Sequence, residues 1–231
     1  HFRPSFGTRA KISIMVVEPK ALHSRHLRRL LWSHRKFHRV LSAQEDFLDR
    51  IPNGIFLPFG TTWVPEWQDL DTTKRANISL VASQKRDLDG HKLRHEIAEW
   101  SIQSGMDVAL IGRGYKPFSH KSEGLAPYRF SIVIENVREK NYFTEKLVDA
   151  VLCETVPIYW GCPNIEKFFD TSGMIICESA GDLKMAIRNA DASMFKKCLP
   201  SIRSIKKKAA HWADLETRAA QSVLGSVEIV K

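Results

Sequence analysis

The sequence contains little cysteine, no long apolar run and no repeated or low-complexity segment. Its 231 residues include four cysteines, all in the second half and without a C-x-x-C spacing. We therefore expect buried thiols in a reducing compartment, with a disulfide bridge as the alternative. No apolar run approaches the roughly 18 residues that cross a membrane, and the amino terminus does not resemble a signal peptide. These absences argue against a secreted or membrane-spanning protein, and we expect a cytoplasmic one.

Acidic residues are outnumbered by basic ones. The chain has 35 Lys and Arg against 26 Asp and Glu, which gives a formal net charge of +9. Such a surplus favours phosphorylated small molecules, polyanions or anionic membrane surfaces as partners. The basic residues are spread along the chain without a recognised nucleic-acid motif, so we expect no nucleic acid to bind. The basic segment 24–39 leaves peripheral contact with a membrane open, and the sequence does not indicate an oligomeric state.

Short apolar segments alternate with amphipathic ones along the chain, which predicts an α/β fold with parallel sheets covered on both faces. Strands are expected at 11–17, 39–41, 55–57, 78–82, 108–111, 130–134, 156–160 and 174–177. Helices are expected at 24–36, 44–50 and 91–103, from Thr144, near Ile165, at 181–189 and, as one or two helices, at 192–224. The segment 61–75 is rich in Pro, Trp, Asp and Thr without a clear period, so we place the crossing between two domains there. The expected domains are 1–75 and 76–231.

The most specific pattern lies between Tyr128 and Phe169. An apolar strand ends in a polar loop with Glu135 and Asn136, and a helix then begins at Thr144. The Thr144 hydroxyl can cap this helix, whose free N–H groups and positive dipole end then face the loop. Lys146 adds a full charge in the first turn, where acids are usually preferred. A strand, a polar loop and a cationic helix start together predict a phosphate site.

This segment resembles the donor-binding signature of the family 10 glycosyltransferases, the alpha-1,3/1,4-fucosyltransferases. That signature is roughly F-x-x-x-x-E-N, a short loop, Y-x-T-E-K-L and then (T/V)-(V/I)-P-(I/V)-x-x-G. The residues that match it are Phe130, Glu135, Asn136, Tyr142, Thr144, Glu145, Lys146, Leu147, Val156, Pro157, Ile158 and Gly161. In the first half, Glu18-Pro19 stands for the family's E-S-P element without its serine, and Pro58-Phe59-Gly60 stands for its P-Y-G turn.

The resemblance implies a GT-B-like fold with two Rossmann-like lobes. Family members carry more chain before the first strand, so the amino-terminal, acceptor-side lobe (1–75) is expected to be small. The carboxyl-terminal lobe (76–231) would bind the nucleotide sugar. Eukaryotic members carry an amino-terminal membrane anchor, and we expect a bacterial-type, viral or trimmed protein that is cytoplasmic or peripheral to a membrane.

The implied reaction is transfer of fucose from GDP-fucose to a glycan hydroxyl with inversion, releasing GDP, as in glycan biosynthesis and protein glycosylation. Two alternatives stay open: a nucleotide-sugar-binding module without transferase activity, and a transferase that uses a different sugar nucleotide. No cofactor is expected beyond the donor GDP-fucose. Asp87-Leu88-Asp89 has the letters of the D-x-D element of metal-dependent glycosyltransferases, but its place before Gly90 favours a polar turn, so we predict no metal site.

Three residues carry the expected chemistry. By resemblance, Arg94 and Lys146 contact the donor diphosphate, where a guanidinium can hold two phosphate oxygens at once. Glu18, at the end of the first strand, occupies the place of the family's presumed general base. Arg94 and Glu18 each have a structural alternative: a solvated arginine on a helix face, and a strand terminated by Pro19.

Four further residues are expected to recognise the donor. By resemblance, Glu145 contacts the ribose and Asn136 contacts the sugar or the diphosphate. Tyr142 would pack on the donor or hydrogen-bond it, and Thr144 would cap the helix that faces it. The alternatives are helix-start chemistry for Glu145 and a core position for Tyr142. For Glu135 we favour a structural role, orienting the loop.

Histidines at helical spacing also occur in and next to the basic segment, at His23, His26, His34 and His38. No Cys, Asp or Glu accompanies them inside the predicted helix. A solvated or anion-binding face is therefore favoured over a metal site.

Overall fold

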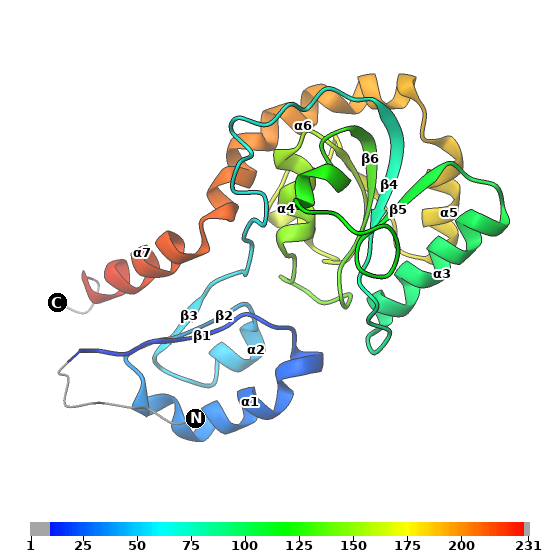
Figure 1. Cartoon of the computed structure of the whole chain (residues 1–231). Coiled ribbons are helices and arrows are strands. Elements are labelled where there is room, and N and C mark those ends of the chain that lie inside the picture. Colours follow the sequence, from blue (N-terminus) through cyan, green and yellow to red (C-terminus); the bar gives the residue numbers. More distant parts are fainter. Residues whose placement is uncertain (1–9, 229–231) are drawn as a thin grey trace. The chain divides into compact units, whose positions relative to one another are not determined.

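The computed structural model describes residues 10–228, which divide into two compact units (Figure 1). The first contains the described residues up to Phe59 together with those from Asp214 onward, and the second is Gly60–Ala213. Both sheets are parallel throughout, so the expected α/β class is confirmed. Within residues 10–228, no helix is both long and apolar enough to cross a membrane.

The first unit holds a small three-stranded sheet. Its strands are β1 (Ile14–Val16), β2 (Val40–Ser42) and β3 (Gly54–Phe56), hydrogen-bonded in that order. Its helices are α1 (Lys20–Ser33) with the 3-10 turn η1 (His34–Lys36), α2 (Glu45–Leu48) and α7 (Leu215–Glu228). Leu27 and Leu30 of α1 pack against the sheet in a core with Val16, Val40 and Phe47. The small amino-terminal sheet agrees with the abbreviated lobe that the sequence predicts.

The second unit holds a five-stranded sheet of order β5-β4-β6-β7-β8. The strands are β4 (Ala76–Val81), β5 (Val108–Ile111), β6 (Tyr128–Ile134), β7 (Val156–Trp160) and β8 (Ile175–Ile176). The helices are α3 (Asp89–Gln103), α4 (Glu145–Leu152), α5 (Ala180–Asn189) and α6 (Ala192–Ala213), with 3-10 turns η2 (Lys121–Gly124) and η3 (Ile165–Lys167). Helices α3 and α5 pack together on one face and α4 and α6 on the other (Figure 1).

The chain reverses direction across this sheet at β4. From β4 it crosses to β5 on one side, and it then returns to β6 on the other side of β4. In an open parallel sheet, the loops that leave such a point diverge, and the crevice at the carboxyl ends of the strands is where ligands bind. The topology therefore points to the ends of β4, β5 and β6.

The boundary between the units differs from the expected one at residue 75. The structure places it between Phe59 and Gly60 and returns α7 to the first unit. The segment after Gly60 is held by the second unit, because the Thr62 hydroxyl and the Trp63 N–H both donate to the Asp149 carboxylate.

Helix α7 belongs to the first unit for a similar reason. The guanidinium of Arg218 donates to the Pro58 and Phe59 carbonyls at 3.1 and 2.7 Å. Arg39 Nε also donates to the Ser226 hydroxyl at 2.9 Å. Neither contact is visible in a local sequence pattern.

Most predicted elements are confirmed, with shifts at their ends. The bounds of β5 and β7 agree with the prediction, while β1 and β8 are shorter and α1 begins earlier, at Lys20. Proline at position 19 sets the extended backbone from which α1 starts. All four cysteines are free thiols, as expected.

Candidate active site

A cavity of about 480 Å³ lies at the carboxyl edge of the five-stranded sheet. This volume is in the range of about 300–1,000 Å³ that small-molecule sites occupy. The segments that follow β4, β5 and β6 line it, together with the starts of α3 and α4. The charged and polar lining residues include Lys85, His91, Arg94, Arg113, Lys121, Asn136, Glu145 and Lys146. The cavity is at the point where the sheet topology places a ligand.

The start of α4 is built around Thr144. Its hydroxyl accepts from the Lys146 N–H at 3.3 Å, which confirms the predicted cap. The same hydroxyl donates to Glu135 Oε2 at 2.7 Å, and the Thr144 N–H donates to Oε1 at 2.8 Å. Glu135 thus fixes the loop against the helix start, which is the structural role that the sequence favours for it.

Glu135 is completely buried beneath the cavity. Burial raises the pKa of its carboxyl, while Lys146 and the Thr144 hydrogen bonds act in the opposite direction. Gly161 is required beside it, because a Cβ there would lie 2.5 Å from Glu135 Cγ. The glycine at the end of the signature therefore makes room for the buried carboxylate.

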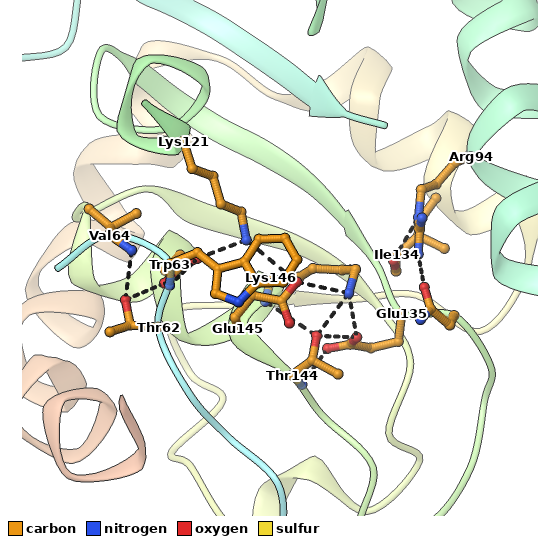
Figure 2. Close-up of polar contacts among 12 residues, drawn as sticks. Thr62, Trp63, Val64, Arg94, Lys121, Ile134, Glu135, Thr144, Glu145 and Lys146 are labelled. Atoms are coloured by element: carbon orange, nitrogen blue, oxygen red, sulfur yellow. Dashed lines mark hydrogen bonds and ion pairs between the residues drawn. The ribbon is translucent and has the colours of Figure 1, made fainter. Parts of the chain in front are cut away.

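Lys146 reaches back over this helix start (Figure 2). Its Nζ lies 3.0 Å from Thr144 Oγ1, 3.1 Å from Glu145 Oε1 and 3.7 Å from Glu135 Oε2. The side chain is 23% exposed and lines the cavity. The Lys146 ammonium thus lies between the carboxylates of Glu135 and Glu145 at the edge of the cavity.

Arg94 approaches the same space from α3. It is 5% exposed, and it donates from Nε to the Ile134 carbonyl at 2.9 Å and from Nη2 to Asn136 Oδ1 at 2.7 Å. Burial lowers the pKa of Arg94, and Glu135 and Glu145 partly offset this. A guanidinium nevertheless stays charged at neutral pH. Among residues 10–228, Nη1 makes no hydrogen bond, so it can serve a ligand in the cavity.

Asn136 joins several of these groups. Its Oδ1 accepts from Arg94 and lies 3.2 Å from His91 Nε2, and its Nδ2 lies 3.5 Å from the Tyr142 hydroxyl. His91 is in turn 2.7 Å from Asp87 Oδ1 through Nδ1. Burial is the main cause that lowers the pKa of His91. The Asn136 side-chain amide is therefore held at its oxygen by Arg94 and His91 and at its nitrogen by Tyr142.

A second group of charges was not anticipated from the sequence. Lys121, in η2, places Nζ 2.7 Å from Asp149 Oδ2 and 3.6 Å from Glu145 Oε1. The Trp63 ring covers this ammonium at 5.0 Å from its centroid (Figure 2). Asp149 lies one helical turn after Glu145, so their shared face of α4 is the only local signal that could have suggested it. Lys121 and Trp63 are distant in sequence and carry no such signal.

The cations decide the ionisation of Glu145. Burial acts to raise the pKa of this carboxyl, but Lys146 and Lys121 outweigh it and lower the pKa to about 2. Glu145 is therefore ionised at neutral pH while only 5% exposed. Its carboxylate can accept hydrogen bonds from a ligand without first losing a proton.

The expected site residues fall into three groups. Arg94, Asn136, Glu145 and Lys146 line one cavity. Tyr142 and Thr144 are each 3% exposed and are bonded to those residues from behind. Glu18 belongs to the other unit, where it follows β1 and precedes α1, so its role stays a prediction.

No group of three or more His, Cys, Asp or Glu within residues 10–228 has the arrangement of a metal site. His23 and His26 of α1 therefore belong to no such group. The rings of His23 and His26 contact each other edge to face, at 5.0 Å between centroids.

Residues 72–186 match the family model described as "Glycosyltransferase family 10 (fucosyltransferase) C-term". Through this segment, the chain belongs to glycosyltransferase family 10. The segment includes every residue of the signature and Arg94, and it begins just before β4.

Named relatives agree with this family. An alpha-(1,3)-fucosyltransferase of Helicobacter pylori is 39% identical over 105 residues, which are 46% of this chain and 22% of that protein. A 3-galactosyl-N-acetylglucosaminide 4-alpha-L-fucosyltransferase of Pan troglodytes is 27% identical over 152 residues, 61% of this chain and 38% of that protein. The chain thus spans well under half the length of the relatives it matches.

Solved structures extend the likeness in fold beyond the family segment. A crystal structure of an alpha1,3-fucosyltransferase with GDP-fucose covers 90% of this chain and 76% of its own, with a TM-score of 0.57 and 18% identity. The crystal structure of TarM covers 93% of this chain and 50% of its own, with a TM-score of 0.57 and 10% identity. The family 10 chain has the GT-B-like fold class that its sequence predicts.

Proposed function

We propose that this chain forms the donor-binding and catalytic part of an inverting fucosyltransferase, which moves fucose from GDP-fucose to a glycan hydroxyl without an essential metal. The observation that carries the proposal is the cavity at the carboxyl edge of the sheet. There Arg94, Lys146 and the ionised Glu145 face one space inside the segment that matches family 10. The donor GDP-fucose is supported by the crystal structures of related fold that hold GDP-fucose or GDP.

The diphosphate of the donor is assigned to the cationic side of the cavity. The leaving GDP gains negative charge as the bond to the sugar breaks, so fixed positive groups lower the barrier. Arg94 is already anchored by the Ile134 carbonyl and Asn136, which orients its free Nη1. Lys146 and the first N–H groups of α4 add charge and donors at a helix start.

The ribose and the sugar are assigned to the remaining polar groups. Glu145 accepts from the ribose hydroxyls, as its ionised state at neutral pH allows. Asn136, held between Arg94 and His91, contacts the sugar or the diphosphate, and Tyr142 supports it from behind.

The acceptor is proposed to be a galactosyl-N-acetylglucosaminide, the class that several relatives' names give. Its hydroxyl oxygen attacks the anomeric carbon of fucose from the face opposite GDP and transfers its proton to Glu18. The bond from the anomeric carbon to the diphosphate oxygen breaks, and GDP leaves. A single displacement of this kind inverts the anomeric centre.

Replacing Lys146 with Ala should weaken GDP binding about 10- to 100-fold, because one charge-assisted contact with the diphosphate is lost. Isothermal titration with GDP measures the change, and circular dichroism checks the fold. Lys184→Ala is the matched control, since Lys184 pairs with Glu96 away from the cavity and should keep full affinity. Full GDP affinity in Lys146→Ala would contradict the diphosphate assignment.

Transfer itself is tested with GDP-fucose and the proposed acceptor, by detecting the fucosylated product. GDP binding without product would favour a binding module that lacks transferase activity. Product formed only with another sugar nucleotide would show that GDP-fucose is not the donor. Either result would leave the nucleotide site in place and contradict the proposed transfer of fucose.

We further propose that α1 contacts anionic membrane surfaces. Arg25, Arg28, Arg29 and Trp32 recur at helical spacing, so they form one stripe, and all four are exposed. Trp32 is 91% exposed, although an indole is normally covered. Cations attract anionic headgroups, and tryptophan favours the membrane interface. The apolar side of α1 is already buried, so the stripe would rest on the membrane without inserting the helix.

Reversing two charges of the stripe, Arg28→Glu with Arg29→Glu, should reduce binding to vesicles that contain phosphatidylglycerol at least about ten-fold. Flotation with and without phosphatidylglycerol measures it. The control is Lys196→Glu with Lys197→Glu, which changes the net charge equally on exposed residues of α6. Equal losses in both double variants would show that only net charge matters, and preferential binding of single-stranded RNA would indicate a nucleic-acid partner.

A further inference from the structure

Lys121 is a buried cation in the cavity wall to which the proposed function gives no role. Its side chain is 10% exposed, and its two carboxylate neighbours are 0% (Asp149) and 6% (Glu145) exposed. Burying an ammonium costs free energy unless opposite charges compensate it. Asp149 and Glu145 supply the opposite charges that compensate Lys121 in the wall.

The charge of Lys121 is secured by its surroundings. Burial acts to lower its pKa, but Asp149 and Glu145 outweigh this and raise it. The ammonium is therefore present at neutral pH. The Trp63 ring above it restricts access of water to one side of the ion pair.

Asp149 fixes Lys121 rather than competing for a ligand. It accepts from the Thr62 hydroxyl and the Trp63 N–H in addition to its ion pair with Lys121. These contacts tie its carboxylate to two segments, so its orientation is set. Within the wall, Asp149 anchors the amine, and the amine extends to Glu145.

Lys121, anchored by Asp149, also limits the orientation of the Glu145 carboxylate. Lys121 and Lys146 both approach the same oxygen, Oε1, at 3.6 and 3.1 Å (Figure 2). Two cations on one oxygen restrict rotation of the carboxylate. They leave Oε2 as the oxygen that no ion pair within residues 10–228 engages.

We propose that Lys121 is a positioning residue for donor recognition, which holds the Glu145 carboxylate in the orientation that accepts from the ribose hydroxyls. This inference rests on the proposed function, because it takes a nucleoside diphosphate as the ligand. Lys121 acts through Glu145 and does not itself contact the donor.

The test compares GDP with its 2′,3′-dideoxy analogue, which lacks the ribose hydroxyls. The unmodified protein should prefer GDP about 10- to 100-fold, since hydrogen bonds to a charged group are lost with the analogue. In Lys121→Met the preference should fall to about three-fold or less, because Lys146 alone then engages Glu145 and the carboxylate can rotate. Affinity for inorganic pyrophosphate should stay within about two-fold, since Arg94 and Lys146 are intact. Isothermal titration measures all three ligands.

Two further variants separate positioning from stability. Lys121→Gln keeps a donor for Asp149 and removes the charge, so it should lose the ribose preference even if Lys121→Met folds poorly. Lys74→Met is the matched control, because Lys74 is a partly buried lysine of the same unit that donates to the Ala126 and Cys153 carbonyls outside the cavity. It should keep the full preference for GDP over the analogue.

Glu145→Gln tests whether Lys121 and Glu145 act through the same contact with the ribose. That variant should lose the ribose preference, and adding Lys121→Met to it should cause no further loss, since both act through one contact. An unchanged preference in Lys121→Gln, or additive losses in the double variant, would overturn the inference. A protein that binds GDP without discriminating the analogue overturns the inference and the ribose assignment of Glu145, but it leaves the diphosphate site standing. A protein that binds neither GDP nor pyrophosphate overturns the proposed function.

Discussion

A Glu18→Gln variant should turn over GDP-fucose and acceptor about 100 to 10,000 times more slowly than the unmodified protein, while binding GDP with unchanged affinity. Glutamine keeps the shape of the side chain but cannot take the proton of the acceptor hydroxyl. The attacking oxygen must then form its bond while still protonated, which raises the barrier of the transfer step. Binding of the donor does not involve this proton, and Glu18 lies outside the unit that holds the cavity.

Initial rates of product formation and titration with GDP give the two readouts of this variant. Asp46→Asn is the control, since Asp46 is an exposed acid of the same unit in the first turn of α2. It should change neither the rate nor the affinity. Undiminished turnover in Glu18→Gln would assign the base to another residue, and a parallel loss of GDP affinity would point to a general defect in folding.

The donor half of the site could be predicted because its information is local. The strand β6, the cap at Thr144 and the cation Lys146 follow one another within a short segment, and each has a recognisable preference. Strands of a parallel sheet covered by helices also read as continuous apolar runs, and the runs at 108–111 and 156–160 predict the observed bounds of β5 and β7.

The wall around Lys121 could not be predicted, because it is assembled from three distant segments. Trp63, Lys121 and Asp149 meet only through the tertiary fold, and nothing near Lys121 in the sequence distinguishes it from a solvated lysine. The boundary between the compact units, which differs from the expected domain boundary, could not be predicted for the same reason. Hydrogen bonds from Thr62 to Asp149 and from Arg218 to Pro58 decide it, and both span long stretches of chain.

The position of Arg94 also depends on a backbone contact of Gly90, which the sequence indicates only as part of a polar turn. Gly90, the second residue of α3, donates its N–H to the Asn136 carbonyl at 3.0 Å. Arg94 lies one turn further along the helix. The approach of α3 to the end of β6 therefore determines whether the guanidinium reaches Ile134 and Asn136.

Gly90→Ala should consequently destabilise the second unit by about 1–3 kcal/mol or more, and it should weaken GDP binding as well. A Cβ at this position would lie 1.7 Å from the Glu135 carbonyl oxygen, a contact that no side-chain rotation can relieve. The end of β6 cannot move easily, since the Glu135 N–H donates to the Trp160 carbonyl at 2.9 Å. The start of α3 must shift instead, and it takes Arg94 with it. Chemical denaturation and titration with GDP measure the two losses.

Gly181→Ala is the matched control for this steric argument. Gly181 is the second residue of α5 in the same unit, and a Cβ there would meet only Ser179 Oγ at 3.5 Å, an ordinary contact. Alanine is the better helix former by up to about 1 kcal/mol, so this variant should be neutral or slightly more stable, with GDP affinity unchanged. Equal stability of the two variants would refute the close approach of α3 to β6. If Gly90→Ala lost stability but kept GDP affinity, Arg94 would not depend on that approach for its place in the site.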